Sequence, residues 1–243
     1  MLISAAQTPD DLAAMVRRRA AGLPLEHVLG WAEFFGLRIA VDPGVFVPRR
    51  RTEFLARQAA TLAHEAAVPA SHRAVVVDLC CGSGAVGAVL AAALDGAELH
   101  AVDLDPAAVR CARRNLAAVG GQVYKGDLYE PLPAALRGRV VILVANAPYV
   151  PTGAIALQPP EARLHEPRVA LDGGADGLDV LRRVIAGAPR WLAPDGGLLV
   201  ETSERQAAQA VEAVTRAGLI PRVASSDELS ATVVIGTRPS GTR

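Results

Sequence analysis

The sequence contains little lysine, little cysteine and few aromatic residues. Lys125 is the only lysine among 243 residues, arginine supplies the other basic charges, and 25 basic side chains balance 25 acidic ones. Proteins that bind nucleic acid over a broad surface normally carry a basic excess, so the balance argues against that class but leaves a local patch open. The three cysteines, of which Cys80 and Cys81 are adjacent, suit neither a disulfide framework nor a four-ligand zinc site. We therefore expect no metal.

Long apolar runs are missing as well. No uninterrupted apolar segment approaches the roughly 20 residues that a membrane-spanning helix needs. Residues 1–11 also lack the basic and apolar regions of a secretory signal. We therefore expect a cytoplasmic protein that makes no membrane contact. Apolar residues nevertheless make up 51% of the chain, which is enough for a substantial core.

Short apolar runs alternate with helical patterns over most of the chain. Five strands and two further β segments are predicted: 75–78, 98–103, 122–127, 140–145, 196–201, 219–225 and 231–237. Four helices are predicted between them: 85–94, 106–118, 175–192 and 204–217. Apolar strands that alternate with helices indicate an α/β fold with a parallel sheet covered on both faces. The last two β segments lie close enough in sequence to pair antiparallel at one edge.

A shorter N-terminal part precedes this pattern. Residues 1–51 are predicted to form an extension of one helix and a β-hairpin, and residues 52–243 the main domain. Thr8 gives a capping signal for the helix. The β-rich stretches on both sides of residues 42–44, Asp-Pro-Gly, predict the hairpin. Thr52 is expected to cap a helix that reaches residue 67.

A glycine-rich turn, DLCCGSG, directly follows the first predicted strand and opens a helix. Such a turn lets a ligand approach the backbone closely, and the helix N-terminus offers free N–H groups. Its predicted binding residues are Asp78, Cys80, Cys81, Gly82, Ser83 and Gly84. A dinucleotide dehydrogenase would require G-x-G-x-x-G, whereas the order here is C-x-G-x-G. A turn that only packs a helix is the other alternative.

Acidic residues also end the second and third predicted strands. Asp103 stands where a carboxylate can accept both hydroxyls of a ribose, and Leu104 follows it. Asp127 and Leu128 stand where side chains can hold an adenine edge. The carboxyl ends of parallel strands meet at one edge of a sheet, so these residues and the glycine-rich turn predict one nucleotide-type site.

The fourth predicted strand ends abruptly in Asn146-Ala147-Pro148-Tyr149. These residues form either an ordinary loop or a pocket for a planar, nitrogen-containing substrate. In the second case the Asn146 side-chain oxygen can accept one N–H of the substrate, and the Ala147 carbonyl can accept the other. Asn146 can also contact the ligand of the nucleotide-type site. Pro148 favours an extended conformation at Ala147 and removes a competing donor. Tyr149 offers a flat wall.

Both motifs resemble those of class I S-adenosylmethionine-dependent methyltransferases. Their cofactor loop reads acidic-x-G-x-G-x-G, and Cys80 stands where its first glycine is usual. Their amino-methyltransferases carry [DNS]-P-P-[YF], and Ala147 replaces one proline of that motif. The resemblance implies S-adenosylmethionine as cofactor. It also implies a Rossmann-like, seven-stranded and mostly parallel sheet with an antiparallel last strand.

Two longer segments resemble the HemK/PrmC group of protein-(glutamine-N(5)) methyltransferases, which act on peptide-chain release factors. Residues 17–55 match its R-x-x-G-x-P, E-F-x-G and P-R-x-x-T-E patterns, with His27 where tyrosine is usual. Residues 165–185 match its E-P-x-x-A-L-x-G-G-x-D-G-L pattern. The implied partner is a protein with an exposed glutamine, such as a release factor. The family usually carries a helical N-terminal domain that helps to dock the release factor, whereas about 30 residues precede the predicted hairpin here. The acceptor therefore stays open.

Other functions remain to be weighed. The arginine clusters at 17–19 and 49–51 could contact phosphate in an enzyme that methylates a nucleic-acid base, although solvated surface charge explains them more simply. A small-molecule amide could be the acceptor, and the altered motif positions could mark a binding module without activity. The stretch 146–172 has no clear secondary structure, and a long loop in a compact domain is usually functional. His165 lies in it, but a surface role is favoured over catalysis.

Overall fold

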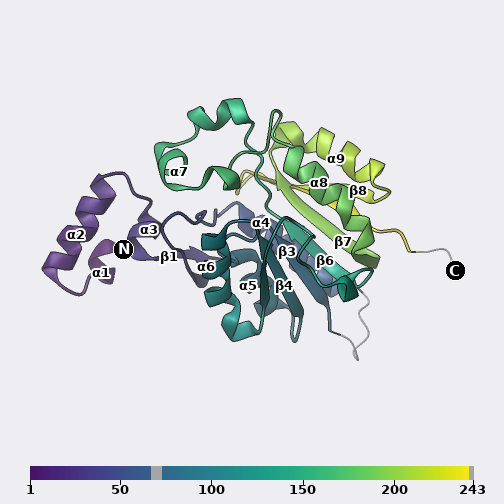
Figure 1. The fold of residues 1–243 in the computed structure, drawn as a ribbon, viewed down its shortest axis with the longest axis horizontal. Helices are drawn as coiled ribbons and strands as arrows, with labels where there is room; N and C mark the ends of the chain where they lie inside the picture. Colours follow the sequence, from purple (N-terminus) through teal and green to yellow (C-terminus); the bar gives the residue numbers. More distant parts are fainter. Residues whose placement is uncertain (67–72, 241–243) are drawn as a thin grey trace.

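The computed structural model describes residues 1–66 and 73–240 (Figure 1). The centre of this part is a seven-stranded sheet in the order β5-β4-β3-β6-β7-β9-β8. Its strands are β3 Val75–Leu79, β4 Glu98–Asp103, β5 Gln122–Lys125, β6 Val140–Ala145, β7 Leu192–Thr202, β8 Ile220–Ser226 and β9 Ala231–Thr237. β9 runs antiparallel to both of its neighbours, and the other pairs are parallel. The predicted α/β fold with an antiparallel last strand is confirmed.

Helices cover both faces of the sheet. They are α4 Thr52–Glu65, α5 Ala85–Ala93, α6 Pro106–Leu116, α8 Asp179–Gly187 and α9 Ala207–Arg216. Along β6, Ile142 and Val144 pack against the side that α4, α5 and α6 cover, whereas Leu143 and Ala145 pack against α8 and α9. All four side chains are fully buried, as the continuous apolar run predicts. No helix in the described segments is long and apolar enough to cross a membrane.

The N-terminal extension holds α1 Leu2–Ala5, α2 Pro9–Ala20, α3 Leu25–Leu29 and a hairpin of β1 Trp31–Phe34 with β2 Leu37–Ala40. The Thr8 hydroxyl accepts the Asp11 N–H at 3.1 Å, so its capping role is confirmed. The predicted position of the hairpin turn is wrong. The strands reverse at Phe35 and Gly36, which both have positive φ, 52° and 76°. Such a two-residue turn matches the twist of paired strands, whereas residues 42–44 form a separate turn beyond β2.

Two other boundaries differ from the prediction. The helix expected over 175–192 begins only at Asp179, because Gly174 and Gly177 adopt positive φ and keep the preceding segment out of a helix. It continues as the 3-10 turn η5, Ala188–Arg190. The stretch expected to lack structure contains α7 Pro160–His165 between the turns η3 Thr152–Leu157 and η4 Arg168–Ala170. The predicted end of α4 at residue 67 lies outside the described residues.

The remaining 3-10 turns are η1 Ala117–Val119, η2 Ala134–Leu136 and η6 Glu204–Gln206.

Asn115 on α6 connects the hairpin to the turn that follows β3. Its Nδ2 donates to the Ala40 and Ser83 carbonyls, both at 2.8 Å, and its Oδ1 accepts the Ala40 N–H at 3.0 Å. A small apolar cluster, in which Val41 and Cys111 are fully buried, packs beside it. The hairpin is thus held against the same turn that the sequence predicts to bind the cofactor. The division into 1–51 and 52–243 stays a prediction.

Replacement of Asn115 by alanine should therefore destabilise the protein. It leaves three backbone groups without their partner, and each such loss in a partly buried site costs about 1 kcal/mol or more. We expect the free energy of unfolding in urea to fall by roughly 2–4 kcal/mol. Arg110→Ala, on the exposed face of the same helix, is the control and should stay within about 0.5 kcal/mol of wild type. Equal stability of the two variants would contradict this role of Asn115.

Candidate active site

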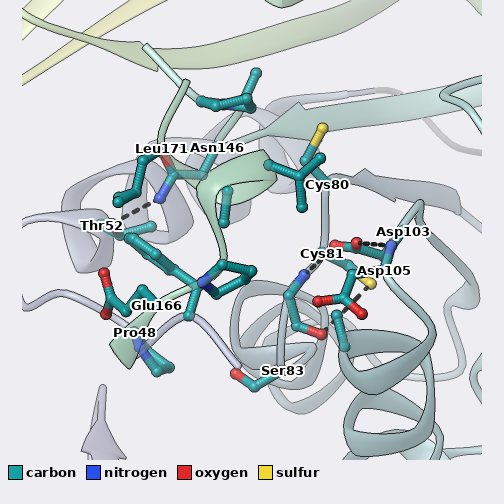
Figure 2. A pocket seen from close by; sticks show the side chains of 18 of the residues that line it. Pro48, Thr52, Cys80, Cys81, Ser83, Asp103, Asp105, Asn146, Glu166 and Leu171 are labelled. Carbon is teal, nitrogen blue, oxygen red and sulfur yellow. Dashed lines mark hydrogen bonds between the residues drawn. The ribbon is translucent and has the colours of Figure 1, made fainter. Parts of the chain in front are cut away.

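A cavity of about 520 Å³ opens at the carboxyl ends of β3, β4 and β6 (Figure 2). This volume suits a small-molecule site. Thirteen of the predicted site residues line it: Asp78, Cys80, Cys81, Gly82, Ser83, Asp103, Leu104, Asp127, Leu128, Asn146, Ala147, Pro148 and Tyr149. Gly84 does not. The structure thus brings the two predicted half-sites together in one cavity, while the role of each residue stays a prediction.

The turn after β3 alternates left-handed residues at Cys80, Gly82 and Gly84, with φ of 54°, 54° and 79°. A Cβ on Gly82 would meet no atom within 4 Å, so this face of the turn is open to a ligand. A Cβ on Gly84 would lie 3.2 Å from the Leu116 side chain and 3.3 Å from the backbone of Ala112. Gly84 therefore allows helix packing. Cys80 holds a conformation that costs a non-glycine residue about 1–2 kcal/mol.

Two buried carboxylates support this turn. Asp78 accepts the Gly87 N–H at 3.0 Å, and burial raises its pKa to about 7, with a further contribution from the charge of Asp103. Asp103 accepts the N–H groups of Gly82 at 2.8 Å and of Asp105 at 2.9 Å. Burial raises the pKa of Asp103 despite these bonds. Each oxygen of Asp103 keeps a further lone pair that can accept a hydroxyl.

An ion pair joins the segment after β5 to α8. The Asp127 carboxylate forms an ion pair with Arg183 at 2.7 Å, and both side chains line the cavity. The sequence prediction missed Arg183, because an arginine within a helical pattern is indistinguishable from ordinary surface charge. Asp127 is thus held in place by a residue from a distant part of the chain.

Asn146 and Thr52 contact each other at the end of the cavity beside β6 (Figure 2). The Asn146 amide nitrogen donates to the Thr52 hydroxyl at 3.2 Å, which leaves Oδ1 as the free acceptor of this side chain. The prediction that Thr52 caps α4 is wrong. Arg51 takes the cap position, and Thr52 is the first helical residue, with its side chain buried. Its position in the helix directs the hydroxyl toward β6 instead of the helix end.

Tyr149 is held by a buried carboxylate and an arginine. Its hydroxyl donates to Glu201 Oε1 at 3.2 Å, and Arg51 Nε lies at the same distance from that oxygen. The Arg51 guanidinium also lies 5.7 Å from the centre of the Tyr149 ring. Burial and the nearby Glu201 raise the pKa of Tyr149 above its usual value. The phenol therefore stays protonated and keeps its ring fixed at the cavity wall.

The segments that resemble the HemK/PrmC patterns meet beside the cavity. Arg49 Nη2 bonds to both oxygens of Glu166, at 2.7 and 2.6 Å, and the Val47 N–H donates to the same carboxylate at 3.1 Å. Glu166 is buried, and this burial raises its pKa although Arg49 opposes the effect. The ion pair joins residues 117 positions apart in the chain. It fixes the start of α4 against the segment after α7.

The glycine-rich segment 173–177 lies directly on the backbone of residues 146–150, here called the acceptor loop after its predicted role. The Val150 N–H donates to Leu171 at 3.0 Å, and the Gly173 N–H donates back to Val150 at 2.9 Å. A Cβ on Gly173 would lie 2.6 Å from the Pro148 carbonyl, and one on Gly177 would overlap the Tyr149 carbonyl. Glycine is required at both positions for this close approach.

The histidines named from the sequence lie apart from the site. His165, on α7, is not among the residues that line the cavity, whereas its neighbour Glu166 is. His27 is buried, and its Nε2 donates to the Val45 carbonyl at 2.9 Å, so it supports the fold. Within residues 1–66 and 73–240, no group of three potential ligands is arranged to hold a metal ion.

The cavity suits S-adenosylmethionine. The open Gly82 face can receive a ligand against the backbone, and the Asp103 oxygens can accept ribose hydroxyls. Asp127 and Leu128 lie at the end where an adenine would be held. The sheet order with its antiparallel β9 and the cavity at the carboxyl ends of the strands are those of a class I S-adenosylmethionine-dependent methyltransferase.

Comparison with known proteins gives the family. The family model of the methyltransferase small domain matches residues 36–162. The release factor glutamine methyltransferase of Geobacter sulfurreducens is 38% identical, over 95% of this chain and 79% of its own. That of Mycolicibacterium smegmatis is 39% identical, over 91% and 78%. The chain belongs to the release factor glutamine methyltransferase family, which confirms the resemblance found in the sequence.

Another relative has a different name. The 4-amino-L-phenylalanine/4-methylamino-L-phenylalanine methyltransferase of Streptomyces pristinaespiralis is 38% identical, over 83% of this chain and 68% of its own. Among solved structures, the catalytic domain of hMettl16 in complex with an RNA hairpin covers 86% of the chain and is itself covered to 78%, with a TM-score of 0.62 and 14% identity. A ribosomal protein L11 methylase from Lactobacillus delbrueckii has a TM-score of 0.57 and 16% identity, over 83% and 85%. These two structures show the shared fold alone.

Alanine at two glycines of the turn should affect different properties, cofactor affinity in one case and stability in the other. Gly82→Ala places a methyl group where a ligand approaches, so S-adenosylmethionine affinity measured by calorimetry should fall about tenfold or more, a loss of about 1.4 kcal/mol. Gly84→Ala should mainly lower the free energy of unfolding, by more than the roughly 1–2 kcal/mol of a left-handed alanine, because its Cβ also presses on α6. If Gly82→Ala binds the cofactor as tightly as wild type, the cofactor does not lie on this turn.

The buried Asp78 should make stability depend on pH. Its folded pKa of about 7 lies above the usual value of 3.8. Below pH 4 the Asp78 carboxyl is protonated in both the folded and the unfolded protein, and its full contribution to the free energy of unfolding is present. As the pH rises toward 7 the unfolded state ionises first, so the contribution falls by up to about 1.4 kcal/mol per pH unit.

Asp78→Asn lacks this titration and provides the test. Its stability relative to wild type should rise between pH 4 and 7 and then level off, as measured by urea unfolding. Asp227→Asn, at an exposed position, should follow wild type throughout. A constant difference between Asp78→Asn and wild type over this range would show that burial does not raise the pKa of Asp78.

Proposed function

We propose that the protein transfers a methyl group to the side-chain amide nitrogen, N5, of a glutamine in a peptide-chain release factor or a related translation protein. Membership of the release factor glutamine methyltransferase family supports this acceptor. The single observation that carries the proposal is the orientation of Asn146 by Thr52, which leaves an oxygen acceptor beside the open cofactor turn. The reaction takes place in the cytoplasm, on protein and without nucleic acid.

The cofactor half of the site binds and orients the methyl donor. S-adenosylmethionine supplies a methyl group bound to a sulfonium sulfur. The backbone of the Cys80–Gly84 turn would hold S-adenosylmethionine, and the Asp103 carboxylate would accept its ribose hydroxyls. Asp127, fixed by Arg183, and Leu128 hold the adenine.

The acceptor half aims the glutamine nitrogen. Its amide has two N–H donors and a delocalised lone pair, so it requires two acceptors in one plane. Asn146 Oδ1 accepts one N–H and the Ala147 carbonyl accepts the other, while the Tyr149 ring lies against the flat amide. As the new N–C bond forms, the bond between the methyl group and the sulfonium sulfur would break and leave S-adenosylhomocysteine, and one proton of the nitrogen would pass to solvent. The residues act by orientation, which is the main requirement for an in-line transfer.

A small aromatic amine is the second candidate acceptor. The relative that is named as a 4-amino-L-phenylalanine methyltransferase supports it. An aniline-type NH2 is also planar and conjugated, and it presents the same two donors to Asn146 and Ala147. The two candidates differ in size: the amine is a small molecule, whereas a protein glutamine must enter the cavity on a loop.

One experiment separates these acceptors. The enzyme is incubated with methyl-labelled S-adenosylmethionine and either a purified release factor or 4-amino-L-phenylalanine, and the products are mapped by mass spectrometry. We expect one methyl group on a glutamine of the release factor. A release factor in which that glutamine is replaced by alanine is the control. Label on the amine alone would favour the second candidate, and label on nucleic acid from an added extract would overturn both.

Substitutions at Asn146 should lower the rate of methyl transfer. Asn146→Ala leaves one N–H of the substrate amide without a hydrogen-bond partner in a dry pocket. The cost is about 1–3 kcal/mol, or roughly 5- to 150-fold in kcat/KM. Thr52→Val removes only the hydroxyl that orients the amide, so a smaller loss is expected. Ala147→Pro should be tolerated, because the carbonyl remains. Unchanged kcat/KM in Asn146→Ala would rule out this acceptor site.

A further inference from the structure

Gln206, in the first turn after β7, makes more hydrogen bonds than its local role requires. Its side chain is buried, with 8% of the residue exposed. The Oε1 atom accepts the Ser203 hydroxyl at 2.6 Å and the Ser203 N–H at 3.4 Å. With Ser203 it forms a capping box at the start of the segment that leads into α9. Only the Oε1 atom of Gln206 takes part in this cap, and its amide nitrogen does not.

The amide nitrogen of Gln206 bonds elsewhere. Its Nε2 donates to the Tyr149 carbonyl and to the Asp176 carbonyl, both at 3.0 Å. Tyr149 belongs to the acceptor loop, and Asp176 belongs to the glycine-rich segment that lies on it. Both donors of the amide are therefore used, and they join two loops that are 27 residues apart in the chain.

Gly177 packs closely against both Gln206 and Tyr149. A Cβ on Gly177 would lie 2.5 Å from Gln206 Nε2 and would also overlap the Tyr149 carbonyl. The acceptor loop has no helix or strand of its own at residues 146–149. The position of this loop thus depends on contacts made from outside it, and Gln206, in the turn η6 after β7, supplies one.

We propose that Gln206 is a positioning residue for methyl transfer. By fixing the Tyr149 carbonyl it fixes the backbone that carries the Ala147 carbonyl and the Tyr149 ring, which orient the acceptor nitrogen. This inference rests on the proposed function for its effect on catalysis. Gln206 itself touches neither substrate nor cofactor. A displacement of about 1 Å in such a loop is enough to reduce the rate by about 100-fold.

Two substitutions separate positioning from capping. Gln206→Glu at pH 8 keeps an oxygen for Ser203 but replaces both donors by an acceptor that faces two carbonyls. Ser203→Ala weakens the cap and leaves the Gln206 amide nitrogen and both of its carbonyl partners in place. If Gln206 only caps the turn η6 together with Ser203, Ser203→Ala should be at least as damaging as Gln206→Glu.

Steady-state kinetics with a release factor and S-adenosylmethionine give the first readout, below the melting temperature of every variant. We expect kcat to fall about 10- to 100-fold in Gln206→Glu, with the cofactor Kd by calorimetry unchanged. Ser203→Ala should keep kcat within about threefold of wild type although its melting temperature falls. Wild-type kcat in Gln206→Glu, or an equal loss in Ser203→Ala, would overturn the proposal.

Hydrogen exchange gives a second readout that needs no acceptor. The Val150 and Gly173 amides, which bond across the two loops, should lose protection in Gln206→Glu and keep it in Ser203→Ala. If wild type methylates no release factor, the proposed function fails, but this measurement still decides whether Gln206 anchors the loop. Unchanged protection in Gln206→Glu would overturn the inference in either case.

Discussion

The parallel pairing of β3 with β4 and β6 is the constraint on which the site depends. Asp78 pairs with Ala101 and with Val144, so the three strands end at nearly the same level. Each chain segment that follows a strand is thereby delivered to one edge of the sheet. The cofactor turn, Asp103 and Asn146 come from three separate parts of the sequence, and only this register places them around one cavity.

The acceptor loop is positioned largely from outside itself. The Thr52 hydroxyl holds Asn146, the Glu201 carboxylate holds the Tyr149 ring, and the glycine-rich segment presses on the backbone. The Arg49–Glu166 pair connects the segments that carry these contacts. Burying Glu166 and Glu201 is costly, and the bonds that Glu166 and the Oε1 atom of Glu201 accept offset part of this cost, while Glu201 Oε2 has no hydrogen-bond partner among the described residues. These contacts hold a stretch without secondary structure in one conformation, which is what the proposed acceptor role of Asn146 and Ala147 requires.

Much of this arrangement could be predicted from the sequence, because its signals are local. The apolar run 140–145 predicts a buried strand, and the glycine-rich turn after β3, together with the acidic residues that end the next two strands, predicts a ligand site. The hairpin turn was placed wrongly, because Asp42-Pro43-Gly44 is a stronger turn signal than the Phe35-Gly36 pair that the strand register selects. Arg183 and Gln206 were missed for another reason: their partners lie far away in sequence, and each residue is ordinary within its own helix. Long-range contacts of this kind leave no local pattern.

The central claim is that Asn146 Oδ1 and the Ala147 carbonyl together hold the acceptor amide. The most direct measurement is a crystal structure of the enzyme with S-adenosylhomocysteine and a release factor or its glutamine-bearing peptide. The glutamine nitrogen should lie within about 2.7–3.2 Å of both oxygens, with its amide plane against Tyr149. If that nitrogen lies outside hydrogen-bonding distance of both oxygens while the product cofactor occupies the Cys80–Gly84 turn, the account of the acceptor site is wrong.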